Sequence, residues 1–440
     1  MKRVLVLGAG LVSRPLVRHL SSQPDVALTL ADAEIGRAEA VAATGRGVRA
    51  VALSVEDTAA LDARVAESDL VVSLLPAPLH PAVARCAIAR RVALVTTSYV
   101  SDEMRALDGA ARDAGVLLLN EAGLDPGIDH MSAMSAIARL RNEGFRIVSF
   151  RSVCGGLPAP EGNTNPWGYK FSWSPRGVLA ASRRPARWLA DGRIVEVGGD
   201  ELFTRAESYE IAGLGRFEVH PNRDAIPYAA TYGLTGVLTM FRGTLRYPGW
   251  SETLLALARL GLLDERERGW RAGTTYAGMM ESFAVEGTGP LRSRVAARAG
   301  VASDGAVIDR LAWAGLFSDR PIGSMSAAPI DLLCARLQDA LTYAEGERDM
   351  IVLRHEIGVV DPAGRERTIE STLVAMGESA GDTAMARTVA LPAAIAARAI
   401  LDGAVGLTGV QIPVHPEIYE PVLASLAAMG IDLRETRSAP

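Results

Sequence analysis

The first 120 residues alternate short apolar runs with helical segments, and this alternation limits the fold more than any other feature. Residues 3–7 (RVLVL) form the first apolar run, a glycine-containing turn follows, and the second run ends at Asp32. Further strands are predicted at 48–53, 70–75, 93–96 and 116–119, with a helix before each. Strands that alternate with helices are typical of a parallel sheet covered on both faces. The chain is therefore predicted to begin with a Rossmann-type dinucleotide-binding domain.

The turn after the first apolar run has the pattern G-x-G-x-x-S, from Gly8 to Ser13. Gly8 permits a tight turn, and Gly10 allows the backbone to approach a pyrophosphate at the start of a helix. Ser13 stands where a third glycine usually lets the helix pack closely. Dinucleotide binding is the prediction, and a Rossmann-like domain that has lost its ligand is the alternative.

Asp32 bears on the choice of cofactor. It lies 22 residues after Gly10, at the end of the second predicted strand. A carboxylate at this place accepts both ribose hydroxyls and repels a 2′-phosphate, which favours NAD. NADP remains the alternative, because Arg37 is near enough to turn toward a 2′-phosphate. Arg37 is otherwise interpreted as a solvated arginine on a helix face.

The chain is long enough for two or three domains, since its 440 residues are about three times the ~150 residues of a common domain. The strand–helix alternation ends near Gly127, and residues 251–346 have a helical pattern. We expect an α/β fold: a Rossmann-type dinucleotide-binding domain, a mixed-sheet α/β substrate domain and a helical insertion. The predicted boundaries are 1–125 completed by 391–440 for the first, 126–247 with 348–390 for the second, and 248–347 for the insertion.

Composition excludes several classes of protein. The net charge of −5 argues against nucleic-acid binding, which needs a clustered basic surface. Three widely spaced cysteines exclude a disulfide framework and indicate a reducing cytoplasm. No apolar run reaches the ~18–20 residues that span a bilayer. The six histidines are scattered without metal-ligand spacing, so no metal site is predicted. A homodimer is expected only because most oligomeric enzymes are symmetric dimers.

Polar residues follow two neighbouring strands at the carboxyl edge of the predicted sheet, where ligands bind in open α/β folds. Ser98 and Tyr99 follow one strand, and Asp125 follows the next. Ordinary packing is the alternative for Tyr99, and capping of the following helix is the alternative for Asp125. Cys154 ends a later predicted strand, and a buried, inert thiol is its alternative.

Five ordered motifs identify a family resemblance. They are 120–130 (NEAGLDPGIDH), 154–161 (CGGLPAPE), 168–176 (GYKFSWSPR), 221–224 (PNRD) and 242–247 (RGTLRY). Together they resemble saccharopine reductases, the glutamate-forming saccharopine dehydrogenases. The resemblance runs from residue 3 to about residue 430 and is weakest over 250–345.

The resemblance implies an oxidoreductase of lysine metabolism. Such an enzyme interconverts saccharopine with L-glutamate and 2-aminoadipate 6-semialdehyde through an imine and a hydride transfer. Asp125 is implied to orient or deprotonate the amine, with Cys154 and Tyr99 as further catalytic candidates. The positions implied to hold saccharopine are Ser98, Tyr99, Asp125, Arg223, Thr244, Leu245 and Arg246. The positions implied to line the dinucleotide are Gly8, Gly10, Leu11, Val12, Asp32, Ser54, Val55, Leu75, Thr97, Ser98, Leu124, Asp125, Pro126 and Ser174.

The chemistry of the substrate agrees with these positions. Saccharopine carries three carboxylates, for which the guanidinium groups of Arg223 and Arg246 are suitable partners. The family pattern is NADP use with an arginine near the end of the second strand, where this chain has Asp32. The active site is expected in a cleft between the dinucleotide-binding and substrate domains. The alternatives are a related imine-reducing dehydrogenase of the carboxynorspermidine type and a non-catalytic NAD-binding sensor.

Lys170 is one of only two lysines beside 44 arginines, the other being Lys2. We hypothesise that Lys170 does something that an arginine cannot, either as a point charge near a carboxylate or in a space too small for a guanidinium. The alternative is an incidental surface lysine.

Overall fold

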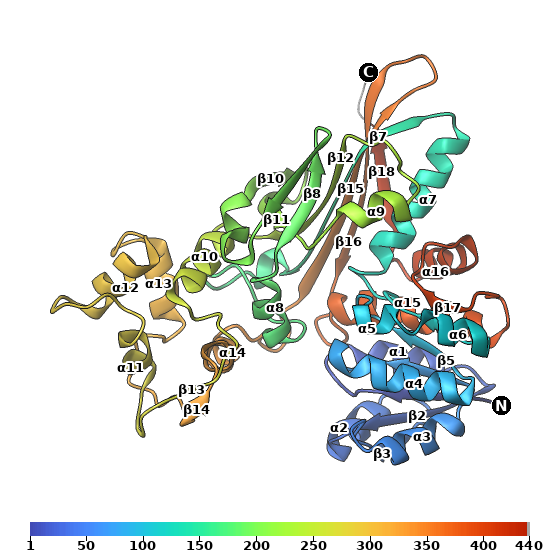
Figure 1. The fold of residues 1–440 in the computed structure, drawn as a ribbon, viewed down its shortest axis with the longest axis horizontal. Helices are drawn as coiled ribbons and strands as arrows, with labels where there is room; N and C mark the ends of the chain where they lie inside the picture. Colours follow the sequence, from blue (N-terminus) through green and yellow to red (C-terminus); the bar gives the residue numbers. More distant parts are fainter. Residues whose placement is uncertain (438–440) are drawn as a thin grey trace. The chain divides into compact units, whose positions relative to one another are not determined.

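The structure is a computed structural model that describes residues 1–437. It divides into two compact units, which are described here one at a time (Figure 1). Of the described residues, the first contains 1–147 and 359–437, and the second contains 148–358.

The first unit is built on a seven-stranded sheet with the order β17-β6-β5-β4-β1-β2-β3. All its neighbouring strands run parallel. The side chains of β1 and β4 are buried on both faces, which explains their continuous apolar runs. The order from β3 to β6 is that of a Rossmann fold, which confirms the predicted α/β class. The strands are β1 Lys2–Leu7, β2 Val26–Asp32, β3 Arg49–Ala52, β4 Leu70–Ser73, β5 Ala93–Thr96, β6 Leu117–Leu119 and β17 Gly409–Gln411.

Helices cover both faces of this sheet (Figure 1). Helices α1 (Ser13–Ser21), α2 (Ile35–Ala42) and α15 (Ala384–Leu401) form one connected layer, with α1 packed against the other two. Helices α3 (Thr58–Ala66), α4 (His80–Arg90) and α6 (Asp108–Ala114) pack together as a second group. The remaining helices of the unit are α5 Asp102–Arg105, α7 Ile128–Asn142 and α16 Pro416–Ala428.

Helix α15 is long and apolar enough to cross a membrane if only its length and composition are considered. Within the protein, 67% of that helix is buried, because it packs on α1 and on strands β4 and β5. Its apolar composition is therefore also that of a core helix, and by itself the helix is weak evidence for a membrane span.

The second sheet has nine strands and mixed directions. Its main path is β10-β11-β12-β7-β15-β16-β18, and β8 joins it at β12 with β9 beside it. Strand β12 runs parallel to β7 and antiparallel to β11, which confirms the predicted mixed sheet. The strands are β7 Arg146–Pro158, β8 Ala186–Ala190, β9 Arg193–Val197, β10 Glu207–Ile211, β11 Gly215–Pro221, β12 Thr239–Arg246, β15 Asp349–Val360, β16 Glu366–Met376 and β18 Leu433–Arg437.

The boundary between the two compact units falls within strands β7 and β15. Residues 126–147 and 359–390, which were expected in the substrate domain, are grouped with the dinucleotide-binding fold. The division into three parts stays a prediction.

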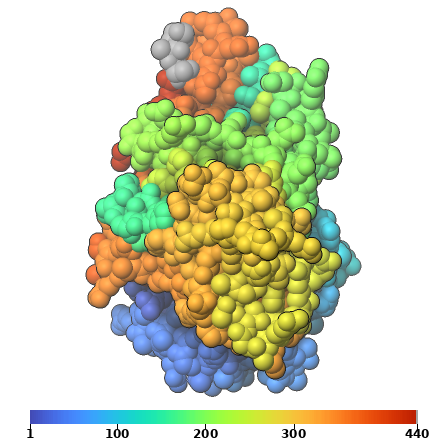
Figure 2. Space-filling view, turned by 90° about the vertical axis from the view of Figure 1, so that its left-hand side faces the viewer, coloured from blue at the N-terminus to red at the C-terminus, as the bar shows by residue number. Residues whose placement is uncertain are grey.

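The helical insertion of the second unit surrounds one large apolar cluster that includes Trp250, Leu254 and Leu333. Its yellow and orange atoms form a continuous surface in Figure 2. The helices of this unit are α8 Pro175–Ala181, α9 Ile226–Thr231, α10 Trp250–Leu260, α11 Tyr276–Glu281, α12 Leu291–Ala299, α13 Ala306–Trp313 and α14 Pro329–Ala340, with a short ribbon of β13 Arg268–Gly269 and β14 Ser326–Ala327.

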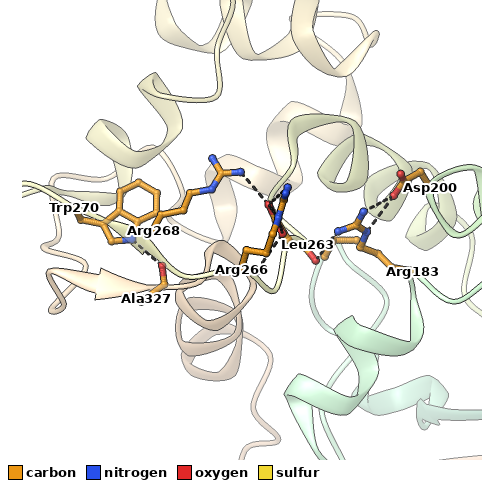
Figure 3. A network of polar contacts seen from close by, with 8 residues as sticks. Arg183, Asp200, Leu263, Arg266, Arg268, Trp270 and Ala327 are labelled. Atoms are coloured by element: carbon orange, nitrogen blue, oxygen red, sulfur yellow. Dashed lines mark hydrogen bonds and ion pairs between the residues drawn. The ribbon is translucent and has the colours of Figure 1, made fainter.

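Arginine–carboxylate contacts fasten the start of this insertion (Figure 3). Asp264 accepts hydrogen bonds from Arg266 at 2.9 Å and from Arg268 at 3.0 Å, and the Arg266 contact is the largest cause of the lowered pKa of Asp264. Arg183 donates to the carboxylate of Asp200 and to the carbonyl oxygen of Leu263. The Asp264 contacts order the segment 264–268 locally, and the Arg183 contact with Leu263 ties the end of α10 to the segment after α8.

Candidate active site

The glycine turn between β1 and α1 has the geometry that a pyrophosphate requires. Gly8 has φ +100°, and a Cβ there would lie 3.2 Å from the backbone of Leu74. No atom lies within 4 Å of the place where a Cβ of Gly10 would be. Ser13, in the place of the third glycine, is buried and donates a hydrogen bond from Oγ to the Gly10 carbonyl oxygen at 2.7 Å. The residues present therefore fit a dinucleotide: Ser13 holds the turn through its hydrogen bond to Gly10, and the space beside Gly10 is open.

Asp32 is tied to this turn. Its Oδ2 accepts a hydrogen bond from the Ala9 amide at 2.8 Å, and its Oδ1 accepts one from the Glu34 amide at 3.0 Å. Arg37 forms an ion pair with Glu34 at 2.9 Å and is 61% exposed. Asp32 thus shapes the turn as well as placing negative charge beside it, and Arg37 is held by Glu34.

The other positions implied for the dinucleotide in this unit follow the strands of the parallel sheet. Ser54 and Val55 follow β3, Leu75 follows β4 and Thr97 follows β5. Leu11 and Val12 complete the glycine turn, and Leu124 to Pro126 belong to the loop after β6. Because the carboxyl ends of parallel strands meet at one edge, the structure brings these positions to the same side of the sheet.

Tyr99 and Asp125 are in direct contact. The Tyr99 hydroxyl donates a hydrogen bond to Oδ1 of Asp125 at 2.7 Å. Helix α7 begins at Ile128 with Gly127 as its N-cap, and no side chain caps it there. The Asp125 carboxylate therefore has a partner in a neighbouring loop, and Tyr99 does more than pack. Its hydroxyl orients the Asp125 carboxylate.

Ser98 is backed by a buried histidine that the sequence did not single out. His80 Nε2 lies 2.9 Å from Ser98 Oγ and 2.8 Å from Thr96 Oγ1, and its Nδ1 lies 3.0 Å from Ser73 Oγ. Burial lowers the pKa of His80 to about 4, so its ring is neutral at pH 7. Only the fold brings it behind Ser98, since 18 residues separate the two in the chain.

In the second unit, three polar side chains lie in one row across the mixed sheet. Thr244 on β12 is in register with Cys154 on β7 and with His220 on β11. Residues in register on adjacent strands face the same side, and Arg246, two residues after Thr244, faces that side too. Leu245 points to the other side of the sheet. The structure therefore places Cys154 beside two of the residues implied to hold the substrate, Thr244 and Arg246.

Arg246 is a buried cation with aromatic neighbours. Its side chain is 7% exposed, and its guanidinium lies 5.0 Å from the ring of Tyr169 and 5.5 Å from that of Trp250. One guanidinium nitrogen donates to the carbonyl oxygen of Leu245 at 2.7 Å, and Nε has no acceptor. Within residues 1–437, no carboxylate pairs with Arg246.

The charge of Arg246 affects its buried neighbour. Burial, reinforced by Arg246, lowers the pKa of His220 to about 3. Moving a cation out of water without a counter-ion is costly, and cation–π contacts offset only about 2 kcal/mol of that cost. This guanidinium is therefore a candidate anion-binding group, and a carboxylate matches the geometry of its fork.

Comparison with known proteins identifies the family. The family model described as "Saccharopine dehydrogenase NADP binding domain" matches residues 4–119. A second model, described as "Saccharopine dehydrogenase C-terminal domain", matches residues 123–431. The chain belongs to the saccharopine dehydrogenase family. The resemblance inferred from the five motifs is confirmed.

Two relatives illustrate this membership. Saccharopine dehydrogenase [NADP(+), L-glutamate-forming] of Saccharomyces cerevisiae is 38% identical over 443 residues, covering 99% of each chain. The mitochondrial alpha-aminoadipic semialdehyde synthase of Mus musculus is 37% identical over 98% of this chain, which corresponds to 47% of that protein. The solved structure of apo histidine-tagged saccharopine dehydrogenase (L-Glu forming) from S. cerevisiae matches with a TM-score of 0.88 and 37% identity over the whole of both chains.

The family membership makes the cofactor a nicotinamide dinucleotide. The matching domain is described as NADP-binding, and the yeast relative is named for NADP(+). The preference for NAD that was drawn from Asp32 receives no support from these similarities.

Three further residues assigned by the saccharopine dehydrogenase motifs keep predicted roles. Arg223 has a left-handed backbone, with φ 57°, between β11 and α9, and its carbonyl oxygen accepts a hydrogen bond from the Arg187 amide. Ser174 caps the N-terminus of α8, where its Oγ accepts a hydrogen bond from the Gly177 amide at 3.2 Å. Cys154 is buried, which suits an inert thiol as well as a catalytic one.

Lys170 lies in the connection between β7 and α8 and is 5% exposed. Its Nζ lies 2.5 Å from Oε2 of Glu347 and donates to Thr164 Oγ1 at 3.0 Å. The Lys170 contact is the largest cause of the lowered pKa of Glu347. Lys170 is therefore a point charge beside a carboxylate, as one of the two hypotheses requires.

We expect the substitution Lys170→Arg to lower the free energy of unfolding by about 1–3 kcal/mol, because a larger guanidinium must enter a filled site. Thermal unfolding at pH 7 measures this, with the exposed Arg193→Lys as the control in the same unit. Because the folded-state pKa of Glu347 is lowered, its pair with Lys170 stabilises the fold at neutral pH. This stabilisation is lost as the pH falls through the folded-state pKa of Glu347. An unchanged Tm for Lys170→Arg would show that the lysine is incidental.

Proposed function

We propose that this chain interconverts saccharopine with L-glutamate and 2-aminoadipate 6-semialdehyde, in the manner of the glutamate-forming members of its family. The observation that carries the proposal is the buried guanidinium of Arg246, which no carboxylate of residues 1–437 neutralises. A substrate with three carboxylates supplies the missing anion.

The reaction proposed here is an oxidation at a secondary amine. A nicotinamide dinucleotide held at the glycine turn of Gly8 and Gly10 would supply the hydride acceptor for the lysine-side carbon next to the nitrogen. The nitrogen would lose its proton in the same oxidation. The resulting imine adds water, and the carbon–nitrogen bond then breaks to release glutamate and the aldehyde. The reverse sequence forms saccharopine.

Residues are proposed for the proton transfers and for binding. Asp125 accepts or orients the proton of the substrate amine, and the hydrogen bond from Tyr99 fixes the direction of its carboxylate. Cys154 is a further candidate for proton transfer. Arg246 and Arg223 bind substrate carboxylates, while Ser98 and Thr244 donate or accept hydrogen bonds. Leu245 contributes packing.

An initial-rate assay at the nicotinamide absorption band tests the proposal. Saccharopine together with an oxidised cofactor should give a rising signal, and glutamate with the semialdehyde should reverse it. Turnover of a carboxylated polyamine but not of saccharopine would favour the carboxynorspermidine-type alternative. Cofactor binding without turnover of either substrate would favour the sensor.

Within this function, we propose that NAD is used more efficiently than NADP. The support is electrostatic: Asp32 places a carboxylate beside the glycine turn, and Arg37 is held by Glu34. We expect kcat/KM for NAD to exceed that for NADP by roughly tenfold, or about 1.4 kcal/mol. Initial rates with each cofactor at saturating saccharopine measure this ratio.

A charge substitution sharpens the same test. Glu34→Gln releases Arg37, so kcat/KM for NADP should rise while that for NAD changes little. Glu39→Gln, an exposed residue on the same helix α2, is the matched control. If the unsubstituted protein used NAD and NADP equally well, or NADP better, this proposal would be contradicted. Arg37 would then be favoured as the residue that binds the 2′-phosphate.

A further inference from the structure

Glu121 has a backbone conformation that is unusual for its residue type and its surroundings. Its φ is 59°, in the left-handed region that favours glycine and asparagine. Three other non-glycine residues of the described chain have positive φ, Arg91, Asp191 and Arg223, and none of them is buried. Glu121 is 4% exposed. A buried carboxylate in this conformation persists only where its surroundings require it.

The contacts of Glu121 enclose Tyr99 from both sides. The Glu121 amide donates a hydrogen bond to the carbonyl oxygen of Ser98 at 3.1 Å. Its Oε1 accepts a hydrogen bond from the amide of Val100 at 2.9 Å. With φ positive, the main chain and the side chain of Glu121 both reach the segment that carries Tyr99. The residues before and after Tyr99 are therefore fixed to one residue of the next loop.

Asp125 belongs to that same loop, four residues after Glu121. Since the Tyr99 hydroxyl donates to Asp125 at 2.7 Å, the two loops are joined twice: Glu121 binds the residues on either side of Tyr99, and Asp125 binds its hydroxyl. A shift of either loop would break this hydrogen bond.

The second carboxylate oxygen of Glu121 is held as well. Its Oε2 lies 2.7 Å from Nε2 of His130 on α7, and Nδ1 of His130 lies 3.7 Å from the carboxylate of Asp129. His130 is fully buried, so the first turn of α7 gives Glu121 a rigid support.

We propose that Glu121 is a positioning residue for the reaction, acting through Tyr99 to set the orientation of the Asp125 carboxylate. This inference rests on the proposed function, because that function assigns the amine chemistry to Asp125. Glu121 touches neither substrate nor cofactor in this scheme. Its role is to fix the tyrosine that fixes the acid–base group.

The test uses two substitutions and a double-mutant cycle in the full chain. Glu121→Asn removes the reach to Val100 while keeping a residue that tolerates positive φ. Glu121→Gln keeps an oxygen acceptor of the same length for the Val100 amide. Each is combined with Tyr99→Phe, and kcat/KM for saccharopine, the dissociation constant of the cofactor and Tm are measured.

We expect Glu121→Asn to lower kcat/KM at least tenfold, with the cofactor dissociation constant within twofold. Glu121→Gln should stay within threefold of the unsubstituted protein. In the Tyr99→Phe background, Glu121→Asn should lower kcat/KM less than threefold, because the hydrogen bond from Tyr99 to Asp125 is already absent.

Three results would overturn the inference. One is that Glu121→Asn lowers kcat/KM by the same factor whether or not the Tyr99 hydroxyl is present. Another is a loss of cofactor affinity equal to the loss of activity. The third is a tenfold or greater fall in kcat/KM in the Glu121→Gln variant. This result contradicts the inference even if the Glu121→Asn variant does not fold. Turnover by the unsubstituted protein is measured first, so a failure of the proposed function appears there and not in the variant ratios.

Discussion

Replacing Arg246 with methionine should raise the KM for saccharopine at least thirtyfold and leave Tm unchanged or higher. Truncating one partner of a desolvated charge pair typically costs ~2–5 kcal/mol of binding, and 2 kcal/mol is about thirtyfold. The same guanidinium has no carboxylate partner within the described chain. In the substrate-free protein this buried charge is therefore destabilising, and its removal should not lower the free energy of unfolding. Substrate affinity and stability should therefore move in opposite directions.

Steady-state kinetics and thermal unfolding check this expectation, with Arg193→Met as the control. Arg193 is an exposed arginine on β9 of the same unit, so its substitution should change neither KM nor Tm. The cofactor KM should stay within about twofold in both variants. Arg223→Met is expected to raise the KM for saccharopine as well. A KM that does not move on removal of Arg246 would make it a structural residue and remove the main support for the substrate.

Replacing Gly127 with alanine should abolish turnover and lower the free energy of unfolding by about 4 kcal/mol or more. A Cβ at this position would lie 2.0 Å from the carbonyl oxygen of Gly123 and 2.3 Å from its carbonyl carbon, and the φ of Gly127 is +147°. Both atoms are backbone, so no side chain can turn away to make room. Losses of this size come only from specific backbone or core conflicts.

The consequence for the site is direct, because Gly123 and Gly127 flank Asp125. Relief of the clash must displace the loop that carries the carboxylate, and the hydrogen bond from Tyr99 would be lost with it. Thermal unfolding measures the loss of stability, and the initial-rate assay with saccharopine measures the loss of turnover. Gly109→Ala in α6 is the control: no atom lies near its Cβ position, and alanine favours a helix by roughly 0.5–1 kcal/mol over glycine. A Gly127→Ala protein that unfolds at the same temperature as the unsubstituted one would contradict the described loop geometry.

The parts of the fold that depend on local pattern were predictable from the sequence. Strand β1 and the turn at Gly8 follow from a buried apolar run and a glycine pair. Strand β17 was missed, because three residues at 409–411 are too few to show a period. They become a strand only by pairing with β6.

The candidate site divides in the same way. Tyr99, Asp125 and Arg246 were found because they stand in motifs or follow strands. The contacts that hold them were not predictable, because they join residues far apart in sequence: Glu121 with Val100, His80 with Ser98, and Arg246 with Tyr169 and Trp250. For Asp32, the sequence indicated a charge toward the ribose, and the structure adds two amide hydrogen bonds that use the same oxygens.

Both ends of the chain build the dinucleotide-binding unit. Strand β17 extends its sheet, α15 covers β4 and β5, and Arg398 of α15 pairs with Asp25 at 2.7 Å. During synthesis, strands β1 to β6 leave the ribosome long before residue 411 is made, so the nascent sheet has an open edge at β6 and an uncovered apolar face. Such a face is prone to wrong association. A shortened chain that stops before α15 would therefore present the glycine turn without the layer that stabilises it, and the ability to hold a nucleotide becomes a late event in the production of this protein.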